Sequence, residues 1–167
     1  MKTLAIYPGS FSPFTIGHQN ILEKAEKIFD EVIVAVGINP EKIKSIPSDK
    51  NEREDLLNSI KDARVDVISK QLENKKVEGY TGFLTDYVRE KEAEGYIVIV
   101  IRGLRNGYDF DYEYTNIRYA LDQKPDLNFV LIPCDPLFLH VSSSAYRAIE
   151  SVQSGAGHNY LARKSKN

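Results

Sequence analysis

The stretch that decides the fold is Tyr-Ile-Val-Ile-Val-Ile at residues 96–101. It is an unbroken apolar run rich in β-branched side chains, and no polar residue interrupts it. Such a run is typical of a central parallel strand that helices cover on both faces. It therefore predicts a sheet whose strands are connected by helices on either side.

The rest of the chain alternates between strand-like and helix-like patterns. Strands are expected at residues 4–7, 32–36, 65–68, 96–101 and 129–134. Helices are expected at about 18–29, 49–60 and 81–92, around Phe110, Tyr114, Ile117 and Leu121, and from Ser142 onward. Residues 69–79 match neither pattern. This order predicts a doubly wound, Rossmann-like α/β fold, a parallel five-stranded sheet with helices on both faces.

Composition narrows the class of protein. The length of 167 residues suits one domain, 1–167, and 42% hydrophobic and 28% charged residues suit a globular chain. The net charge of −2 argues against a nucleic-acid partner. A lone cysteine, Cys134, excludes an internal disulfide. With no signal peptide and no long apolar run, we expect a cytoplasmic protein with no membrane partner.

The segment Tyr-Pro-Gly-Ser-Phe-Ser-Pro-Phe-Thr-Ile-Gly-His at residues 7–18 leaves the first strand and opens the first helix. Gly9 and Gly17 allow a ligand to approach the backbone, and free N–H groups at a helix start favour a phosphate. His18, on the first turn, can donate a hydrogen bond to the same phosphate. Neither a Walker loop nor a G-x-G-x-x-G fingerprint is present. Alone, the segment fits a plain strand-to-helix turn equally well.

A second motif follows the most apolar strand. Arg102 and Arg105 flank Gly103, where two guanidinium groups can each bind an anion in a forked geometry. The alternative is a pair of solvated loop arginines. Two acids that open the next helix, Asp109 and Asp111, are explained by the helix dipole alone.

A third motif, from His140 to Arg147, begins a helix with the three serines Ser142 to Ser144. Their hydroxyls and the free N–H groups of the helix start can bind a phosphate, with Arg147 one turn later. Simple capping of the helix is the alternative, although capping needs only one serine.

The three motifs follow the first, fourth and fifth predicted strands at their carboxyl ends, and Lys42 lies in the loop after the second predicted strand. In a doubly wound sheet those ends share one edge, where ligands bind near the topological switch point. Positive groups and helix starts from four places therefore face one cleft, which predicts a polyphosphate site.

The same residues resemble a known group of enzymes. The segments at residues 15–18 and 142–147 are similar to the T/H-x-G-H and Ser-Ser-Ser/Thr-x-x-Arg/Lys motifs of the nucleotidyltransferase superfamily. Within it, Ile-Arg-Gly-Leu-Arg at 101–105 followed by Asp-Phe-Asp-Tyr-Glu at 109–113 resembles the phosphopantetheine adenylyltransferase family. The resemblance runs from residue 3 to about residue 150. The tail at about 155–167 differs from the family's final helix, and Ser12 stands where the family commonly has Asp.

The resemblance implies transfer of AMP from ATP to 4′-phosphopantetheine, giving dephospho-coenzyme A and pyrophosphate in coenzyme A biosynthesis. It implies Mg²⁺ held mainly by the ATP phosphates, with no metal site on the protein, and a homo-oligomer, a hexamer in the family. The catalytic residues it implies are His18 and Lys42. The acceptor-binding residues are Ser10, Lys42, Leu84 and Arg102. The ATP-binding residues are Ser10, Phe11, Gly17, His18, Gly103, Leu104, Arg105, Glu113, Phe138, Leu139, His140, Val141, Ser142, Ser143 and Ser144.

Two other functions are open. A nicotinate or nicotinamide mononucleotide adenylyltransferase shares the histidine motif and a similar serine segment, although the block at 101–105 argues against it. A non-catalytic nucleotide-binding relative would keep the fold without the reaction.

Overall fold

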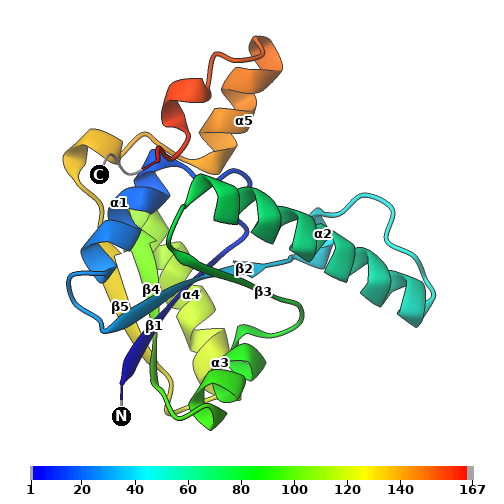
Figure 1. Cartoon of the computed structure of the whole chain (residues 1–167), viewed down its shortest axis with the longest axis vertical. Helices are drawn as coiled ribbons and strands as arrows, with labels where there is room; N and C mark the ends of the chain where they lie inside the picture. The colour runs from blue at the N-terminus through cyan, green and yellow to red at the C-terminus, as the bar shows by residue number, and fades with distance from the viewer. Residues whose placement is uncertain (1, 165–167) are drawn as a thin grey trace.

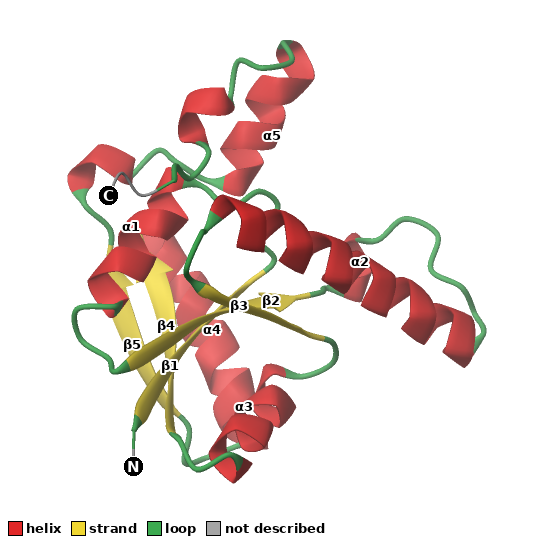
Figure 2. Ribbon diagram, in the orientation of Figure 1, coloured by secondary structure: helices red, strands yellow, loops and turns green. Residues whose placement is uncertain are grey.

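The computed structural model describes residues 2–164, whose five parallel strands form one sheet in the order β3-β2-β1-β4-β5 (Figures 1 and 2). The strands are β1 (Thr3–Gly9), β2 (Glu31–Gly37), β3 (Lys76–Tyr80), β4 (Ile97–Leu104) and β5 (Asn128–Pro133). The α-helices are α1 (Ile16–Ala25), α2 (Lys50–Gln71), α3 (Leu84–Ala93), α4 (Gly107–Gln123) and α5 (Ser143–Val152). Three short 3₁₀ turns are η1 (Pro40–Lys42), η2 (Pro136–Phe138) and η3 (His158–Tyr160). The doubly wound α/β prediction is confirmed.

The strand β1 lies at the centre of the sheet, between β2 and β4. Its residues Leu4, Ala5 and Ile6 are 0% exposed. Successive side chains of a strand point to opposite faces. Leu4 and Ile6 therefore contact the core with Val88 of α3, whereas Ala5 contacts the other core with Leu22 of α1. The strand order reverses between β1 and β4, which places the switch point there.

The helices form a layer on each face of the sheet (Figure 2). The first core cluster joins α1 and the end of α2 to one face, and the second joins α3 and part of α4 to the other. Figure 1 shows α5 and the segment that follows it beyond the carboxyl ends of the strands. Within residues 2–164, no helix combines the length and the apolar character needed to cross a membrane.

The prediction of a third strand at residues 65–68 is wrong, because these residues belong to the 22-residue helix α2. The apolar side chains of this segment follow a helical stripe. Ile68 is 2% exposed and Val65 packs against the same core, whereas Val67 is 63% exposed. The true third strand, β3, lies in the segment that matched neither pattern. It is an edge strand whose only aliphatic side chain is Val77, so no run of apolar residues marks it.

The helix predicted around Phe110, Tyr114, Ile117 and Leu121 is confirmed as α4. Its rings Phe110 and Tyr114 are 44% and 53% exposed, whereas its acid Glu113 is buried, at 9% exposed. Another difference concerns β4, which continues to Leu104, so Arg102 and Gly103 of the second motif lie on the strand and Arg105 directly follows it.

The assignment of residues 65–68 to a helix predicts the effects of two substitutions at the exposed Val67. We expect Val67→Ala to leave the free energy of unfolding unchanged or to raise it by about 0.5 kcal/mol, because alanine is the better helix former. Val67→Pro should lower it by about 3 kcal/mol, because it breaks the helix interior. Urea unfolding of both variants measures this. A loss above about 1 kcal/mol in Val67→Ala would indicate a strand.

Candidate active site

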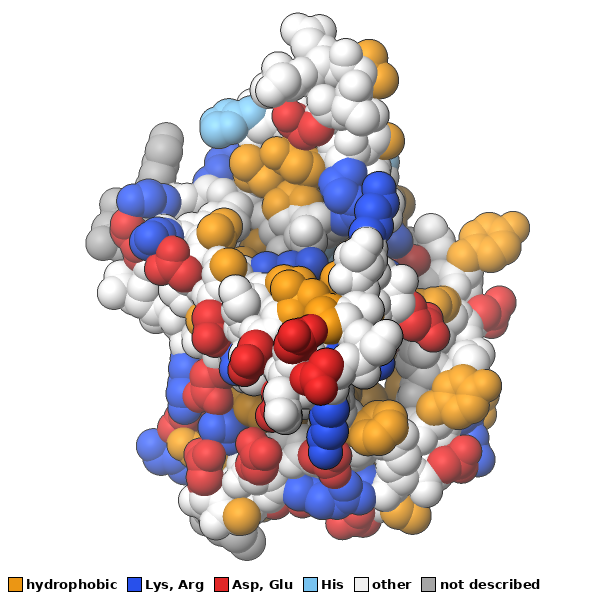
Figure 3. All heavy atoms as spheres, turned by 90° about the vertical axis from the view of Figure 1, so that its right-hand side faces the viewer, with side chains coloured by type: hydrophobic (Ala, Val, Ile, Leu, Met, Phe, Trp, Pro, Cys, Tyr) orange, Lys and Arg blue, Asp and Glu red, His pale blue; other side chains and the backbone are white. Residues whose placement is uncertain are grey.

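A cavity of about 820 Å³ opens at the carboxyl ends of β1 and β4. On the face drawn in Figure 3 the surface is hollowed below the uppermost part of the molecule, with Lys or Arg side chains beside the hollow. Most of the sequence-predicted site residues line the cavity: Ser10, Phe11, Gly17, His18, Lys42, Leu84, Arg102, Gly103, Leu104, Arg105, Glu113, Phe138, Val141, Ser142 and Ser143. The predicted convergence of the three motifs and Lys42 on one cleft is confirmed.

The start of α1 holds His18 in a defined orientation. Thr15 is the N-cap of this helix, and its backbone N–H donates to His18 Nδ1 at 3.0 Å. Because a backbone N–H can only donate, Nδ1 must accept, and the proton of a neutral ring is on Nε2. The ring packs against Phe11 and Phe14, with centroids 5.1 Å and 5.3 Å away.

The pKa of His18 is lowered from 6.5 to about 4, first by burial and then by the positive charges of Arg105 and Arg102. At neutral pH the imidazole is therefore uncharged, and it can still donate a hydrogen bond from Nε2. A neutral donor of this kind binds a phosphate oxygen without bringing a charge into the partly buried site.

Each arginine of the second motif is held by an acid from α4. Nε and Nη2 of Arg102 donate to Glu113 at 2.5 Å and 2.8 Å, and Nη1 donates to the Pro8 carbonyl at 2.7 Å. Nε and Nη2 of Arg105 donate to Asp109 at 2.7 Å and 2.8 Å. Asp109 therefore does more than complement the helix dipole, since it orients a guanidinium group at the cavity wall.

The pKa values of Arg102, Arg105 and Asp109 shift in the direction that favours the charged form of each group. Burial would lower the pKa of Arg102, but the hydrogen bonds to Glu113, together with electrostatic attraction to Glu113, Tyr7 and Tyr80, outweigh burial and raise it. The hydrogen bond to Asp109 raises the pKa of Arg105, and the same bond lowers the pKa of Asp109. Both arginines are thus fixed cations whose charge is partly compensated inside the protein.

The glycine between the two arginines has a packing role. A Cβ atom built on Gly103 would lie 2.8 Å from Cγ1 of Ile21, closer than real side chains approach. The missing side chain lets α1 lie against the end of β4, which brings His18 and the arginine pair to the same cavity. This contact does not depend on a ligand.

The serine motif at α5 binds the backbone of the loop between β1 and α1. Ser143 Oγ donates to the Pro13 carbonyl at 2.8 Å, and Arg147 Nη1 donates to the Ser12 carbonyl at 2.6 Å. Ser142 caps α5, because its hydroxyl accepts from the Ala145 N–H at 3.0 Å. Capping therefore explains Ser142, whereas Ser143 holds the loop that leads to His18.

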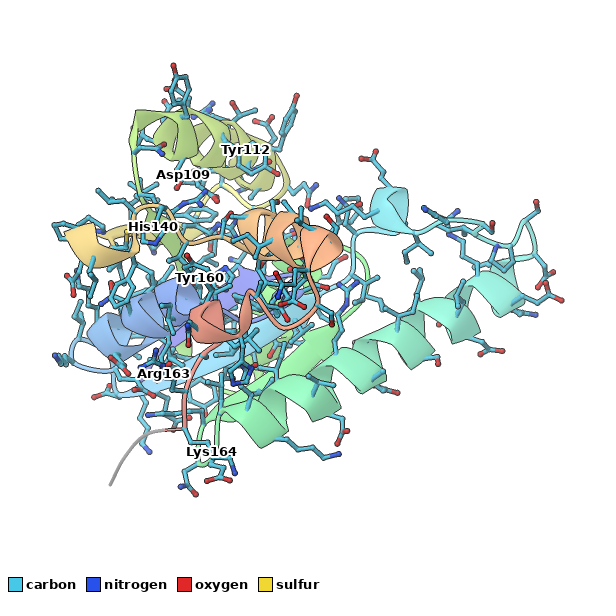
Figure 4. The ribbon with its side chains drawn as sticks, turned by 90° about the horizontal axis from the view of Figure 1, so that it is seen from above. Asp109, Tyr112, His140, Tyr160, Arg163 and Lys164 are labelled. Carbon is cyan, nitrogen blue, oxygen red and sulfur yellow. The ribbon has the colours of Figure 1, made fainter. Side chains whose placement is uncertain are left out.

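Three predicted ATP-binding residues, Leu139, His140 and Ser144, are absent from the cavity wall described here. His140 instead packs edge-on against Tyr160, with ring centroids 5.8 Å apart, and both side chains are labelled in Figure 4. Ser144 accepts a hydrogen bond from Arg147 at 3.3 Å. For these three residues, ATP binding stays a prediction.

Sequence reasoning missed several residues of the cavity wall. At the end of β3 and just after it, the wall includes Tyr80, Gly82 and Phe83, which were not found because the third strand was placed elsewhere. On α4 it includes Tyr112 and Asn116, one and two turns from the acid that holds Arg105. Their spacing of three to four residues on that helix was a usable signal.

The cavity has the chemistry of an anion site. Between residues 2 and 164, no three His, Cys, Asp or Glu side chains gather in a way that could hold a metal ion. The carboxylates of Asp109 and Glu113 in the wall are bound to arginines. What remains for a ligand is N–H and O–H donors and positive charge, which suit phosphate groups.

Comparison with known proteins agrees with this chemistry. Residues 6–149 match the family described as cytidylyltransferase-like. A phosphopantetheine adenylyltransferase from Clostridium novyi (strain NT) is 35% identical over 146 residues, which are 87% of this chain and 82% of that protein. The chain belongs to the phosphopantetheine adenylyltransferase family. A further member, from Geotalea daltonii, is 34% identical over 152 residues, 89% of this chain and 84% of that one.

Solved structures share the fold of this family. The nicotinic acid mononucleotide adenylyltransferase of Plasmodium falciparum superposes with a TM-score of 0.55 and 15% identity, covering 96% of this chain and 91% of that one. A bifunctional NMN adenylyltransferase/ADP ribose pyrophosphatase from Francisella tularensis has a TM-score of 0.54 and 15% identity, covering 100% and 46%. At such identities the likeness shows the common α/β architecture alone.

The environment of His18 predicts a pH effect on stability. Its pKa is about 4 in the folded chain against an ordinary 6.5, so the unfolded chain binds more protons between these pH values. Stability due to His18 is therefore present above pH 6.5 and is lost as the pH falls toward 4. Between pH 7 and pH 5 we expect the wild type to lose about 2 kcal/mol more than His18→Gln, measured by urea unfolding. Equal losses would show that His18 has an ordinary pKa.

The pair of Arg102 and Glu113 predicts a stability effect of a different origin. Glu113→Gln leaves a largely buried guanidinium group without its counter-charge, so we expect the free energy of unfolding to fall by about 2 kcal/mol. Asp111→Asn, an exposed acid of the same helix, is the matched control and should change it by less than about 0.5 kcal/mol. Equal effects of the two variants in chemical denaturation would contradict the role of Glu113.

Proposed function

We propose that this chain transfers AMP from ATP to 4′-phosphopantetheine, giving dephospho-coenzyme A and pyrophosphate. One observation carries the proposal. In a chain that belongs to the phosphopantetheine adenylyltransferase family, His18 of α1, Lys42 of η1 and the two arginines at the end of β4, Arg102 and Arg105, line one cavity. The likeness to nicotinic acid mononucleotide adenylyltransferases, at 15% identity, concerns the fold and does not favour that substrate.

The proposed reaction needs no general base. An oxygen of the acceptor phosphate is already anionic, and it attacks the α-phosphorus of ATP. The new P–O bond forms as the bond between the α-phosphorus and the bridging oxygen breaks, and that oxygen leaves on pyrophosphate with the electron pair. Catalysis then consists of alignment and of stabilising the charge that grows on the α-phosphate and the leaving group.

Within this scheme His18 and Lys42 act on the transition state. The neutral His18 donates its Nε2 proton in a hydrogen bond, and its orientation is already set by Thr15. Lys42 is an exposed cation of η1, and no ion pair is found for it among the described residues, so its charge is free for a phosphate. Preorganised donors of this type typically contribute about 10²–10³ in rate each.

The two arginines orient the substrates. Each guanidinium group has five N–H bonds, and three N–H groups of Arg102 bind Glu113 and Pro8, leaving two for the acceptor phosphate. With Ser10 and Leu84, Arg102 forms the proposed acceptor side of the cavity. The ATP side is proposed to comprise Phe11, Gly17, Gly103 to Arg105, Glu113 and Phe138 to Ser144.

The donor set fits Mg²⁺ bound through the nucleotide. Mg²⁺ retains several waters and usually binds substrate phosphates, with few protein ligands. The acids Asp109 and Glu113 already accept hydrogen bonds from arginines. Phosphate oxygens of ATP would therefore hold the ion, which would neutralise charge on the leaving pyrophosphate.

The proposal extends to the state of the protein. We take residues 1–167 as one cytoplasmic domain that assembles as a homo-oligomer, a hexamer by family resemblance. On α4 the rings of Tyr108, Tyr112 and Tyr119 are 87%, 66% and 66% exposed. Their spacing of four and seven residues places the three rings on one side of the helix, and association would cover them.

An acceptor assay tests the reaction. The protein is incubated with ATP and, separately, 4′-phosphopantetheine, nicotinate mononucleotide and nicotinamide mononucleotide, and pyrophosphate release is followed. We expect pyrophosphate release only when the acceptor is 4′-phosphopantetheine. When CTP replaces ATP, little pyrophosphate should be released. A thermal shift with ATP but no release with any acceptor would instead indicate a non-catalytic nucleotide-binding protein.

The role of His18 has its own test. In His18→Ala we expect kcat to fall by about 10²–10³ while KM for both substrates changes by less than about threefold, because the lost interaction belongs to the transition state. The exposed His158 gives the matched control, and His158→Ala should keep normal kinetics. Near-normal turnover in His18→Ala would remove His18 from the mechanism.

A further inference from the structure

The last described residues of the chain run beside the loop that leads to His18. Leu161 forms an isolated antiparallel bridge with Thr15. The Ala162 N–H donates to the Phe14 carbonyl at 3.1 Å. Ala162 is 8% exposed and belongs to the same core cluster as Phe14. The segment 161–163, hereafter the tail segment, is therefore an integral part of this side of the molecule.

One side chain joins the tail segment to the loop. Gln71, the last residue of α2, donates its side-chain amide to the Phe14 carbonyl at 3.0 Å and to the Ala162 carbonyl at 3.2 Å. The Phe14 carbonyl thus accepts two hydrogen bonds, one from Gln71 and one from Ala162, which use both its lone pairs. The same peptide group that contains the Phe14 carbonyl also contains the Thr15 N–H.

A second connection lies on the other side of His18. Gln19 Nε2 donates to the Arg163 carbonyl at 3.1 Å, and the Arg163 N–H donates to Gln19 Oε1 at 2.9 Å. The tail segment is therefore bound both before and after His18 in the sequence. Figure 4 labels Arg163 and the next residue, Lys164, which lies nearer the edge of the molecule and pairs with Glu73.

The contacts of Gln71 and Ala162 hold the peptide group whose N–H orients His18. Thr15 is 0% exposed, and its N–H is the donor to His18 Nδ1 at 3.0 Å. That N–H belongs to the peptide whose carbonyl, Phe14 O, is held by Gln71 and Ala162. A peptide plane is rigid, so fixing the carbonyl fixes the direction of the N–H.

We propose that Gln71 and the tail segment are a positioning device for His18, which they hold with Nε2 toward the cavity by fixing the Phe14–Thr15 peptide. The catalytic part of this inference rests on the proposed function. The device acts through Thr15 and does not touch the substrates. A shift of about 1 Å at this peptide is enough to break the bond to Nδ1 and to cost a large factor in rate.

The main test is Gln71→Met, which keeps the length of the side chain and removes its donors. We expect kcat to fall about tenfold or more while KM for ATP changes by less than about twofold, since alignment is lost and binding is not. Glu73→Gln is the matched control. It removes the ion pair with Lys164 near the same tail, and it should leave kcat within about twofold of the wild type.

A second readout needs no turnover. The ring of His18 is titrated by NMR, with its signal assigned by comparison with His18→Gln. In the wild type we expect a pKa near 4, set by burial and by Arg105 and Arg102, which face the ring. In Gln71→Met we expect the pKa to rise toward 6.5, because a loosened loop admits water to the ring. In Glu73→Gln it should stay near 4.

The outcomes separate this inference from the proposed function. If Gln71→Met has the kcat and the His18 pKa of the wild type, the contacts of the tail segment contribute to packing but do not position His18, and the inference fails. If no acceptor supports turnover, the function fails, and the titration still decides the positioning. Should Gln71→Met lose its cooperative unfolding, Gln19→Ala replaces it at an accessible position. A shift of the His18 titration in that variant supports the device, and none overturns it.

Discussion

The parallel pairing of β1 with β4 is the constraint on which the site depends. Residues 4–6 of β1 are completely buried, and of the β4 residues that pair with them Val98 is 4% and Val100 0% exposed. Because the two strands run in the same direction, the loop after β1 and the end of β4 meet at one edge of the sheet. His18 and the arginine pair therefore share a cavity although about eighty residues separate them in the chain. Gly103 completes the arrangement, since the absence of a side chain lets α1 approach β4.

Much of this could be predicted from residue patterns, and the failures have physical reasons. The apolar run at 96–101 is long and needs two covered faces, so it identified an interior strand, β4, and with it the edge that carries the site. The third strand could not be placed this way. A buried helical stripe through Val65 and Ile68 contains β-branched residues, as strands do, while the edge strand β3 is polar. On α4 the apolar spacing predicted the helix but not the burial of Glu113, which follows from its ion pair with Arg102.

The contacts of the site could be predicted even less, because they depend on individual hydrogen-bond partners. Sequence patterns placed Ser143 and Arg147 near phosphates, and in the structure they bind the backbone of the loop after β1. The tail segment had no recognisable pattern at all, since one bridge and a few backbone bonds leave no trace in residue spacing. A consistent principle emerges nevertheless. His18, Arg102 and Arg105 in the cavity wall are already oriented by protein partners, so binding of an anion there would need little reorganisation.

The pairing of both arginines with acids has a consequence for long-range electrostatics. Two of the cavity's three cationic side chains, Arg102 and Arg105, share their charge with Glu113 and Asp109 at close range. Within about one Debye length of the surface each pair acts as a dipole, whose field falls off faster than that of a single charge, so the attraction of a polyanion comes mainly from Lys42. Encounter with a nucleotide should then depend only weakly on ionic strength. Discrimination among anions would arise at contact, through the directions of the remaining N–H groups, so that shape and not net charge selects the ligand.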